Sequence, residues 1–170
     1  MLKVVISVIV SVCMAHTLYA KEAAQELGGF YVGSALVVEA VPKHEDNGVG
    51  LLIKAGKKLD AVMKNLGVEA EMTASLMDPE FNGKKADILT LATYVTYDIE
   101  VPKIPLTVRP RFGVIAPNLG DNESVHSRNL GLSTGLLAAY RITPHVSLFI
   151  DYTNLGEKVN NYGLGAEFNF

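Results

Sequence analysis

The sequence contains no tryptophan and a single cysteine among its 170 residues. A lone cysteine excludes a disulfide framework within the chain and any site built from several thiolates. Basic residues are also too few for a nucleic-acid partner, because 15 lysines and arginines are outnumbered by 18 aspartates and glutamates. The apolar fraction of 49%, with only seven prolines, excludes a disordered or collagen-like chain. A single folded domain is therefore the expectation.

Long apolar runs are confined to the amino terminus. Lys3 precedes the apolar segment 4–14, and small residues follow up to Ala20. This pattern is typical of a secretory signal peptide, so we expect residues 1–20 to be removed and residues 21–170 to fold as the mature protein. The cysteine, at position 13, lies in the removed segment. Beyond it, charged residues interrupt every apolar stretch before it reaches the roughly 20 residues of a membrane-spanning helix.

The mature chain instead alternates apolar and polar residues with a period of two, which indicates strands with two different faces. In residues 129–136, for example, leucine and threonine at the even positions alternate with asparagine, glycine and serine at the odd ones. Eight segments are interpreted as strands: 30–38, 49–56, 68–76, 87–98, 108–116, 129–141, 146–153 and 161–170. The connections between them are alternately long and polar or short, which is typical of an up-and-down barrel. We predict an all-β fold, an eight-stranded antiparallel up-and-down barrel.

Three local features stay open at this point. The segment 30–38 is apolar on both faces, so its orientation is not determined. Residues 60–66 fit either a plain hairpin or a helical turn. Pro110 interrupts a strand pattern, and because proline lacks the amide donor of a paired strand, we expect a bulge there or a strand that begins nearby.

The polar face decides which side of the barrel is inside. It mixes charged residues with many glycines. On a soluble surface a strand glycine costs conformational entropy and packs nothing, whereas a narrow lumen needs small residues between its few long side chains. We therefore place the polar row in the lumen and the apolar row toward lipid, which predicts a transmembrane β-barrel. The predicted lumen ion-pair network is Lys54, Glu69, Glu71, Asp98, Arg109, Arg111, Arg141, Asp151 and Glu167. Within it we expect Lys54 beside Glu71 and Asp98 beside Arg109.

Outward aromatic residues fall near the two ends of the predicted strands. The set at one rim is Tyr97, Tyr140, Phe168 and Phe170, and the set at the other is Tyr152 and Tyr162. Aromatic girdles at two membrane interfaces would have this distribution. The alternative is that tyrosine and phenylalanine simply favour strands.

The last strand carries a further signal. Apolar or aromatic residues occupy every second position from Tyr162 through Leu164 and Phe168 to the final Phe170. With the signal peptide and eight alternating segments, this resembles the small OmpA-like and porin-family outer-membrane β-barrel proteins. The resemblance implies a monomer in the bacterial outer membrane, with lipid around it. It also implies that the barrel-assembly machinery and periplasmic chaperones act during biogenesis, with these four residues as the assembly signal.

No catalytic, cofactor or metal site is predicted. Asp121, Ser124 and His126 lie in one predicted loop, and catalytic triads need a fold that fixes each member. The mature histidines fall in different connections, so they cannot form one metal site. We therefore expect a non-enzymatic protein with a structural or surface-interaction role. A narrow porin-like channel is the alternative, and an outer-membrane enzyme or a soluble lipocalin-like carrier is a third class.

Overall fold

The computed structural model describes residues 28–40, 47–77, 80–81, 84–85, 87–120, 130–154 and 160–170. Its eight long strands are β1 (Phe30–Ala40), β2 (Gly48–Lys58), β3 (Leu66–Met77), β6 (Asp87–Tyr97), β8 (Leu106–Gly120), β9 (Gly131–Arg141), β10 (Val146–Asn154) and β11 (Asn160–Asn169). The short strands are β4 (Glu80–Phe81), β5 (Lys84–Lys85) and β7 (Ile99–Glu100). Within the described ranges, no helix is long and apolar enough to cross a membrane.

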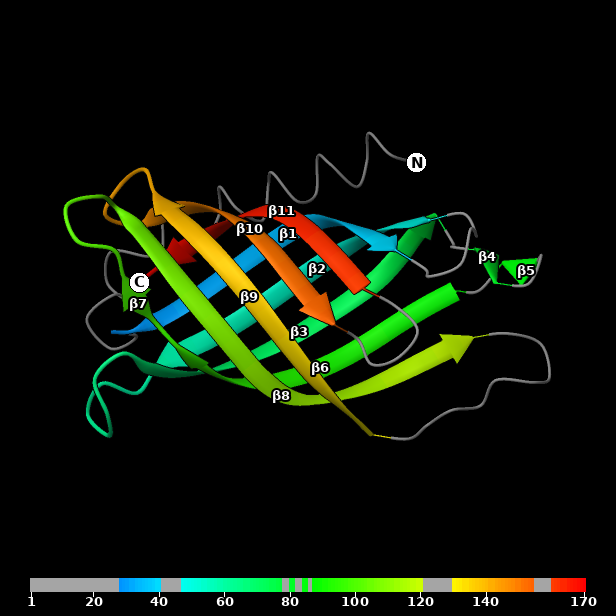
Figure 1. Cartoon of the computed structure of the whole chain (residues 1–170), viewed down its shortest axis with the longest axis horizontal. Coiled ribbons are helices and arrows are strands. Elements are labelled where there is room, and N and C mark those ends of the chain that lie inside the picture. The colour runs from blue at the N-terminus through cyan, green and yellow to red at the C-terminus, as the bar shows by residue number, and fades with distance from the viewer. Residues whose placement is uncertain are drawn as a thin grey trace.

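The long strands form one closed sheet. Neighbours pair in the order β6, β3, β2, β1, β11, β10, β9, β8, and β6 also pairs with β8 (Figure 1). Every pairing is antiparallel, including the one between the first and last strands. The fold is therefore the predicted eight-stranded up-and-down barrel, with β4 and β5 as a separate small hairpin.

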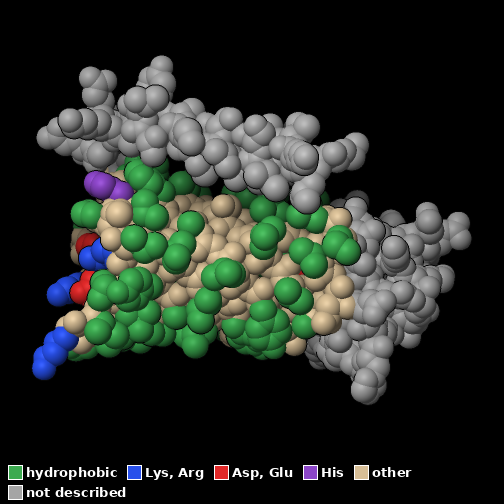
Figure 2. All heavy atoms as spheres, turned by 90° about the horizontal axis from the view of Figure 1, so that it is seen from above, with side chains coloured by type: hydrophobic (Ala, Val, Ile, Leu, Met, Phe, Trp, Pro, Cys, Tyr) green, Lys and Arg blue, Asp and Glu red, His purple; other side chains and the backbone are tan. Residues whose placement is uncertain are grey.

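Side chains alternate between the lumen and the outer wall. On β2, Leu52 and Lys54 are 0% and 1% exposed, whereas Ile53 between them is 47% exposed. The same alternation continues around the barrel, so the large apolar side chains cover the outside and the charged ones are buried. Figure 2 shows hydrophobic side chains spread over the wall, with lysine, arginine and acidic side chains gathered at one end.

The first strand obeys this alternation as well. Tyr31, Ala35 and Val37 point into the lumen, each at most 3% exposed, whereas Leu36 and Val38 point outward. The segment is apolar on both faces because part of the lumen is itself filled by apolar and aromatic side chains. This settles the orientation that the sequence left open.

The tight connections lie at one end of the barrel, on the left of Figure 1, together with the start of β1 and the end of β11. There the Phe170 backbone N–H donates to the Phe30 carbonyl at 2.9 Å. Residues 60–65 form turns and a bend without a helix, β3 begins at Leu66, and the side chain of Asp60 accepts the Asn65 N–H at 2.9 Å. The longer polar connections predicted from sequence fall wholly or partly outside the described residues, as does the predicted signal peptide.

Of the two alternatives predicted for Pro110, the bulge is absent and the strand that begins nearby is found, since β8 begins at Leu106, four residues earlier. Pro110 lies inside β8 and pairs with Leu136 in a continuous register. The missing donor is accommodated on the other side of β8, where β6 ends at Tyr97 and β7 begins only at Ile99. The one register shift between β2 and β3 lies at Val49 and Gly50 instead.

Lumen glycines leave room for the large inward side chains. A Cβ on Gly56 would overlap the ring of Tyr31, and one on Gly135 would press against the guanidinium of Arg111. Gly56 lies opposite Tyr31 in the ladder of β1 and β2. Large and glycine positions thus alternate around the inner wall, as a narrow lumen requires.

Candidate functional site in the barrel lumen

The site is a cluster of buried charges in the half of the lumen nearer the tight turns and at mid-height. Its three fully enclosed cations are Lys54 of β2 and Arg109 and Arg111 of β8, each at most 3% exposed. They face five carboxylates contributed by β3, β10, β11 and the residue between β6 and β7. These acids are Glu69, Glu71, Asp98, Asp151 and Glu167, each at most 6% exposed.

Arg109 links the β6–β7 junction to β11. Its Nε lies 2.5 Å from Asp98 Oδ1, and its Nη1 lies 2.9 Å from Glu167 Oε2 and 3.6 Å from Glu69 Oε2. The guanidinium also lies over the Tyr31 ring, 4.5 Å from its centroid. Arg109 and Asp98 face each other in the gap between the β6–β8 and β7–β8 ladders, which is the neighbour relation expected from the sequence.

Arg111 links β3 to β10 across the lumen. Its Nη1 donates to Glu69 and to Glu71, both at 2.7 Å. Its Nη2 donates to Asp151 at 2.5 Å and also to Thr153 Oγ1. One guanidinium therefore holds three carboxylates, which is an arrangement that arginine's forked donors allow.

Lys54 shows where the sequence-based pairing was wrong. It lies opposite Glu71 in the ladder of β2 and β3, but its Nζ contacts Glu167 at 2.8 Å and Glu69 at 3.4 Å. The ammonium also lies 4.2 Å from the centroid of the Phe149 ring. Side chains lean along their strands, so the diagonal neighbour on β3 and the acid on β11 become the partners instead of the direct one.

Arg141 is the predicted network member that the structure does not place with the others. It is the last residue of β9 and is exposed at the end of the barrel with the tight turns. In the alternation of β9, its position is one that points toward the lumen. It lies at the end of the strand, however, beyond the enclosed part of the lumen. At this mouth Lys58, whose side chain is 32% exposed, contacts Asp98 at 3.3 Å.

Two tyrosines belong to the cluster although the sequence did not single them out. The Tyr31 hydroxyl donates to Glu69 at 3.0 Å, and the Tyr94 hydroxyl shares a hydrogen bond of 3.0 Å with Ser133. The Tyr94 ring lies under the Arg111 guanidinium, 4.9 Å from its centroid. The inward phase of Tyr94 was readable from the alternation on β6, whereas that of Tyr31 was hidden because β1 is apolar on both faces.

The cluster is held together by charge and lies across the lumen. Its ion pairs join β2, β3, β8, β10, β11 and the residue between β6 and β7. Burying such groups unpaired would be far more costly than leaving them in water, so mutual pairing is what lets them occupy the interior. We call these residues, with Tyr31, Tyr94 and Phe149, the plug. Among the residues that the structure describes, no group of three or more His, Cys, Asp or Glu side chains is placed to hold a metal ion.

The residues of the predicted assembly signal lie along β11 and at its end. Tyr162 and Leu164 are 52% and 66% exposed on the outer wall. Phe168 contacts Phe170 edge to face, with ring centroids 5.1 Å apart, and also stacks on His145. At the opposite end of the strand, the ring centroids of Tyr162 and Tyr152 lie 5.3 Å apart. The predicted loop residues Asp121, Ser124 and His126 lie outside the described residues.

Known proteins match this chain in structure only. No family model and no curated protein matches the sequence. Neisserial surface protein A superposes with a TM-score of 0.59, at 18% identity over 84% of this chain and 98% of that one. The outer membrane protein Ail of Yersinia pestis gives 0.57 at 14% identity, over 84% and 99%. The N-terminal β-barrel domain of Pseudomonas aeruginosa OprF gives 0.55 at 14% identity, over 84% and 98%.

The fold is that of the small outer-membrane β-barrels. The resemblance inferred from the alternating segments and the last strand is therefore confirmed at the level of fold. A de novo designed transmembrane β-barrel matches over 84% of this chain as well, with a TM-score of 0.53. Barrel geometry alone thus accounts for much of the likeness.

Proposed function

We propose that this chain is an integral protein of the bacterial outer membrane, closed by its plug, with a structural or surface-interaction role. The observation that supports this is the inverted distribution of side chains. Leu36, Leu132 and Leu164 on the outer wall are 61%, 67% and 66% exposed, while the plug charges are buried. In water the exposed apolar wall would be costly at about 25 cal/mol per Å². In a bilayer the same wall contacts lipid acyl chains, which are apolar as well, so this cost does not arise.

The orientation follows from the connections. Small outer-membrane barrels have short periplasmic turns and longer external loops. In this proposal the end with the tight turns, the start of β1 and the end of β11 faces the periplasm. The opposite end, where the β4–β5 hairpin lies (Figure 1), faces outward and makes the surface contacts.

The plug favours a closed barrel over a narrow channel. A solute moving along the axis would have to pass Arg109, Arg111 and Lys54, which are tied by ion pairs to acids on other strands. Eight strands leave an interior only just wide enough for side chains. A structural role in the envelope needs no passage, and no catalytic step is part of this proposal.

Biogenesis is the part of the proposal that involves protein partners. The barrel-assembly machinery and periplasmic chaperones would act on the unfolded chain, and Tyr162, Leu164, Phe168 and Phe170 would form the recognised segment. Support comes from the placement of β11, which pairs with β1 over ten residues and so completes the barrel. A strand that closes the ring is a suitable place for a signal that the whole chain is present.

Membrane fractionation and heat-dependent electrophoretic mobility test the proposal. The folded protein should sediment with the outer membrane and migrate differently when it is not boiled. Leu36→Arg, which places a charge on the exposed wall at the middle of β1, should lower stability by about 2–4 kcal/mol in lipid. The matched control is Ala61→Arg in the exposed β2–β3 turn, which should have no such effect. A soluble species without a heat shift, or equal stability of the two variants, would contradict the proposal.

A further inference from the structure

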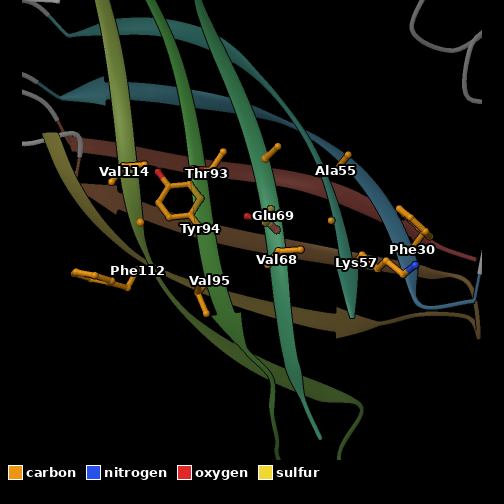
Figure 3. Close-up of a pocket in the computed structure, with 13 residues that line it drawn as sticks. Phe30, Ala55, Lys57, Val68, Glu69, Thr93, Tyr94, Val95, Phe112 and Val114 are labelled. Atoms are coloured by element: carbon orange, nitrogen blue, oxygen red, sulfur yellow. The ribbon is translucent and has the colours of Figure 1, made fainter. Parts of the chain in front are cut away.

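A groove of roughly 650 Å³ lies on the outer wall of the barrel, and its lining includes Glu69 and Tyr94 of the plug, whose side chains are buried on the lumen side. It crosses β2, β3, β6 and β8, and Phe30 of β1 borders one end. Figure 3 shows Phe30 and Lys57 together at that end, with Phe112 and Val114 at the other. The volume falls within the range of small-molecule sites.

The strand register creates this groove. Ala55, Ala70 and Thr93 lie side by side on adjacent strands and form a row of small outward side chains. Larger side chains form a parallel row on each side of it. One row is Lys57, Val68, Val95 and Phe112, and the other is Ile53, Met72 and Leu91. The small row is thus the floor of a trough, and of the two rows of larger side chains the one from Lys57 to Phe112 lines the groove.

The trough runs obliquely from the rim with the tight turns toward the middle of the apolar wall. Lys57 is the last residue but one of β2, so it lies close to the end with the tight turns. Val114 lies eight residues after Leu106, where β8 begins at that same end. With a rise of about 3.4 Å per residue and a strand tilt of about 45°, the groove gains roughly 17 Å along the barrel axis between Lys57 and Val114. This is about half of the 30 Å hydrocarbon core of a bilayer, or the depth of one leaflet.

A cation marks the rim end of the trough. Among the barrel-strand residues whose side chains the structure describes, Lys57 is the only charged one that points outward. Its Nζ lies over the Phe30 ring, 4.5 Å from the centroid. A lysine near a membrane end reaches toward the headgroups with its ammonium while its stem stays against apolar surface. The apolar trough therefore begins at a positive charge at headgroup level.

We propose that this groove binds a glycerophospholipid with an anionic headgroup from the periplasmic leaflet. Lys57 contacts the phosphate, and one acyl chain follows the floor over Ala55, Ala70 and Thr93 toward mid-membrane. The proposal rests on the membrane location and orientation given above. It goes beyond them because it assigns a particular lipid position to one face of the wall.

A second copy of the chain is a poorer occupant of the same groove. Two barrels inserted in the same direction are related by an axis along the membrane normal, so contact through this face would bring the two Lys57 side chains together at equal depth. Like charges at close range oppose such a dimer. A phospholipid offers the opposite charge at that depth and an apolar chain beyond it.

Lipid retention by the purified, folded protein tests the proposal. Dioleoyl phosphatidylglycerol is titrated into the detergent-solubilised protein, and bound lipid is counted by native mass spectrometry. We expect Lys57→Gln to weaken binding about fivefold, the effect of one surface lysine on an anionic lipid. Ala70→Trp, which fills the floor, should weaken it by tenfold or more, with Ala55→Phe as a second filling variant. The matched controls are Lys64→Gln in a turn and Ala166→Trp on β11.

The outcomes separate this inference from the proposed function. Each variant is first checked for the heat shift, so that only folded barrels enter the titration. A wild type without a heat shift would overturn the membrane assignment itself. A normal heat shift with unchanged lipid binding in both Lys57→Gln and a folded filling variant would overturn the lipid site alone. Disulfide-linked dimers of Ala70→Cys in vesicles would also overturn it, because a second copy would then occupy the groove.

Discussion

Replacing Arg111 by methionine should destabilise the barrel strongly. The substitution keeps an unbranched side chain but removes the charge that three carboxylates share, since Glu69, Glu71 and Asp151 lie 2.5–2.7 Å from its Nη atoms. Breaking a buried pair by removing one partner costs about 3–5 kcal/mol, because the remaining charge has no compensation. With a urea dependence of about 1–3 kcal/mol per molar, the unfolding midpoint should fall by about 2 M.

Urea titration of the protein in lipid vesicles, read by the heat shift on gels, measures this change. Arg141→Met is the matched control, because Arg141 is exposed at the rim, and exposed charges contribute about 0–1 kcal/mol. Adding Glu71→Gln to Arg111→Met should recover part of the loss, and a double-mutant cycle gives the coupling. An unfolding midpoint for Arg111→Met equal to that of the wild type would refute the reasoning. It would mean that water stabilises the three carboxylates in the lumen when their arginine partner is absent.

Three further predictions concern conduction, assembly and packing. In planar bilayers the wild type should pass little current, and the double variant Arg109→Ala, Arg111→Ala should conduct; large steady wild-type currents would instead favour the channel. Deleting Phe170 should leave the chain in the periplasm, as fractionation would show, and normal insertion would mean that the terminal residue is ordinary strand composition. Gly113→Ala should destabilise the barrel, because its Cβ would overlap a backbone oxygen of β6, whereas Gly131→Ala has its nearest contact at 3.4 Å and should unfold like the wild type.

The strands and their faces could be predicted from sequence because period-two alternation reports directly on a wall between lipid and lumen. The same local signal could not give the partners across the lumen. Lys54 pairs with Glu167, 113 residues away, and such contacts depend on the stagger of the whole barrel. The inward position of Tyr31 could not be predicted either, because residues 30–38 are apolar on both faces and so do not show which face lines the lumen. The sequence also could not choose between a bulge and a nearby strand start at Pro110, because the gap that accommodates the missing donor lies between β6 and β7.

The seam between β1 and β11 has a consequence for how the molecule comes to exist. Phe30 and Phe170 meet at this seam, so the contacts that complete the ring join residues from the two ends of the described chain. Any shorter nascent chain carries two unpaired edges, which lipid cannot satisfy. Partial products therefore have no stable membrane-inserted form, and closing so long a loop makes folding slow. Insertion must follow synthesis of the last strand, and the barrel should form in a single cooperative event.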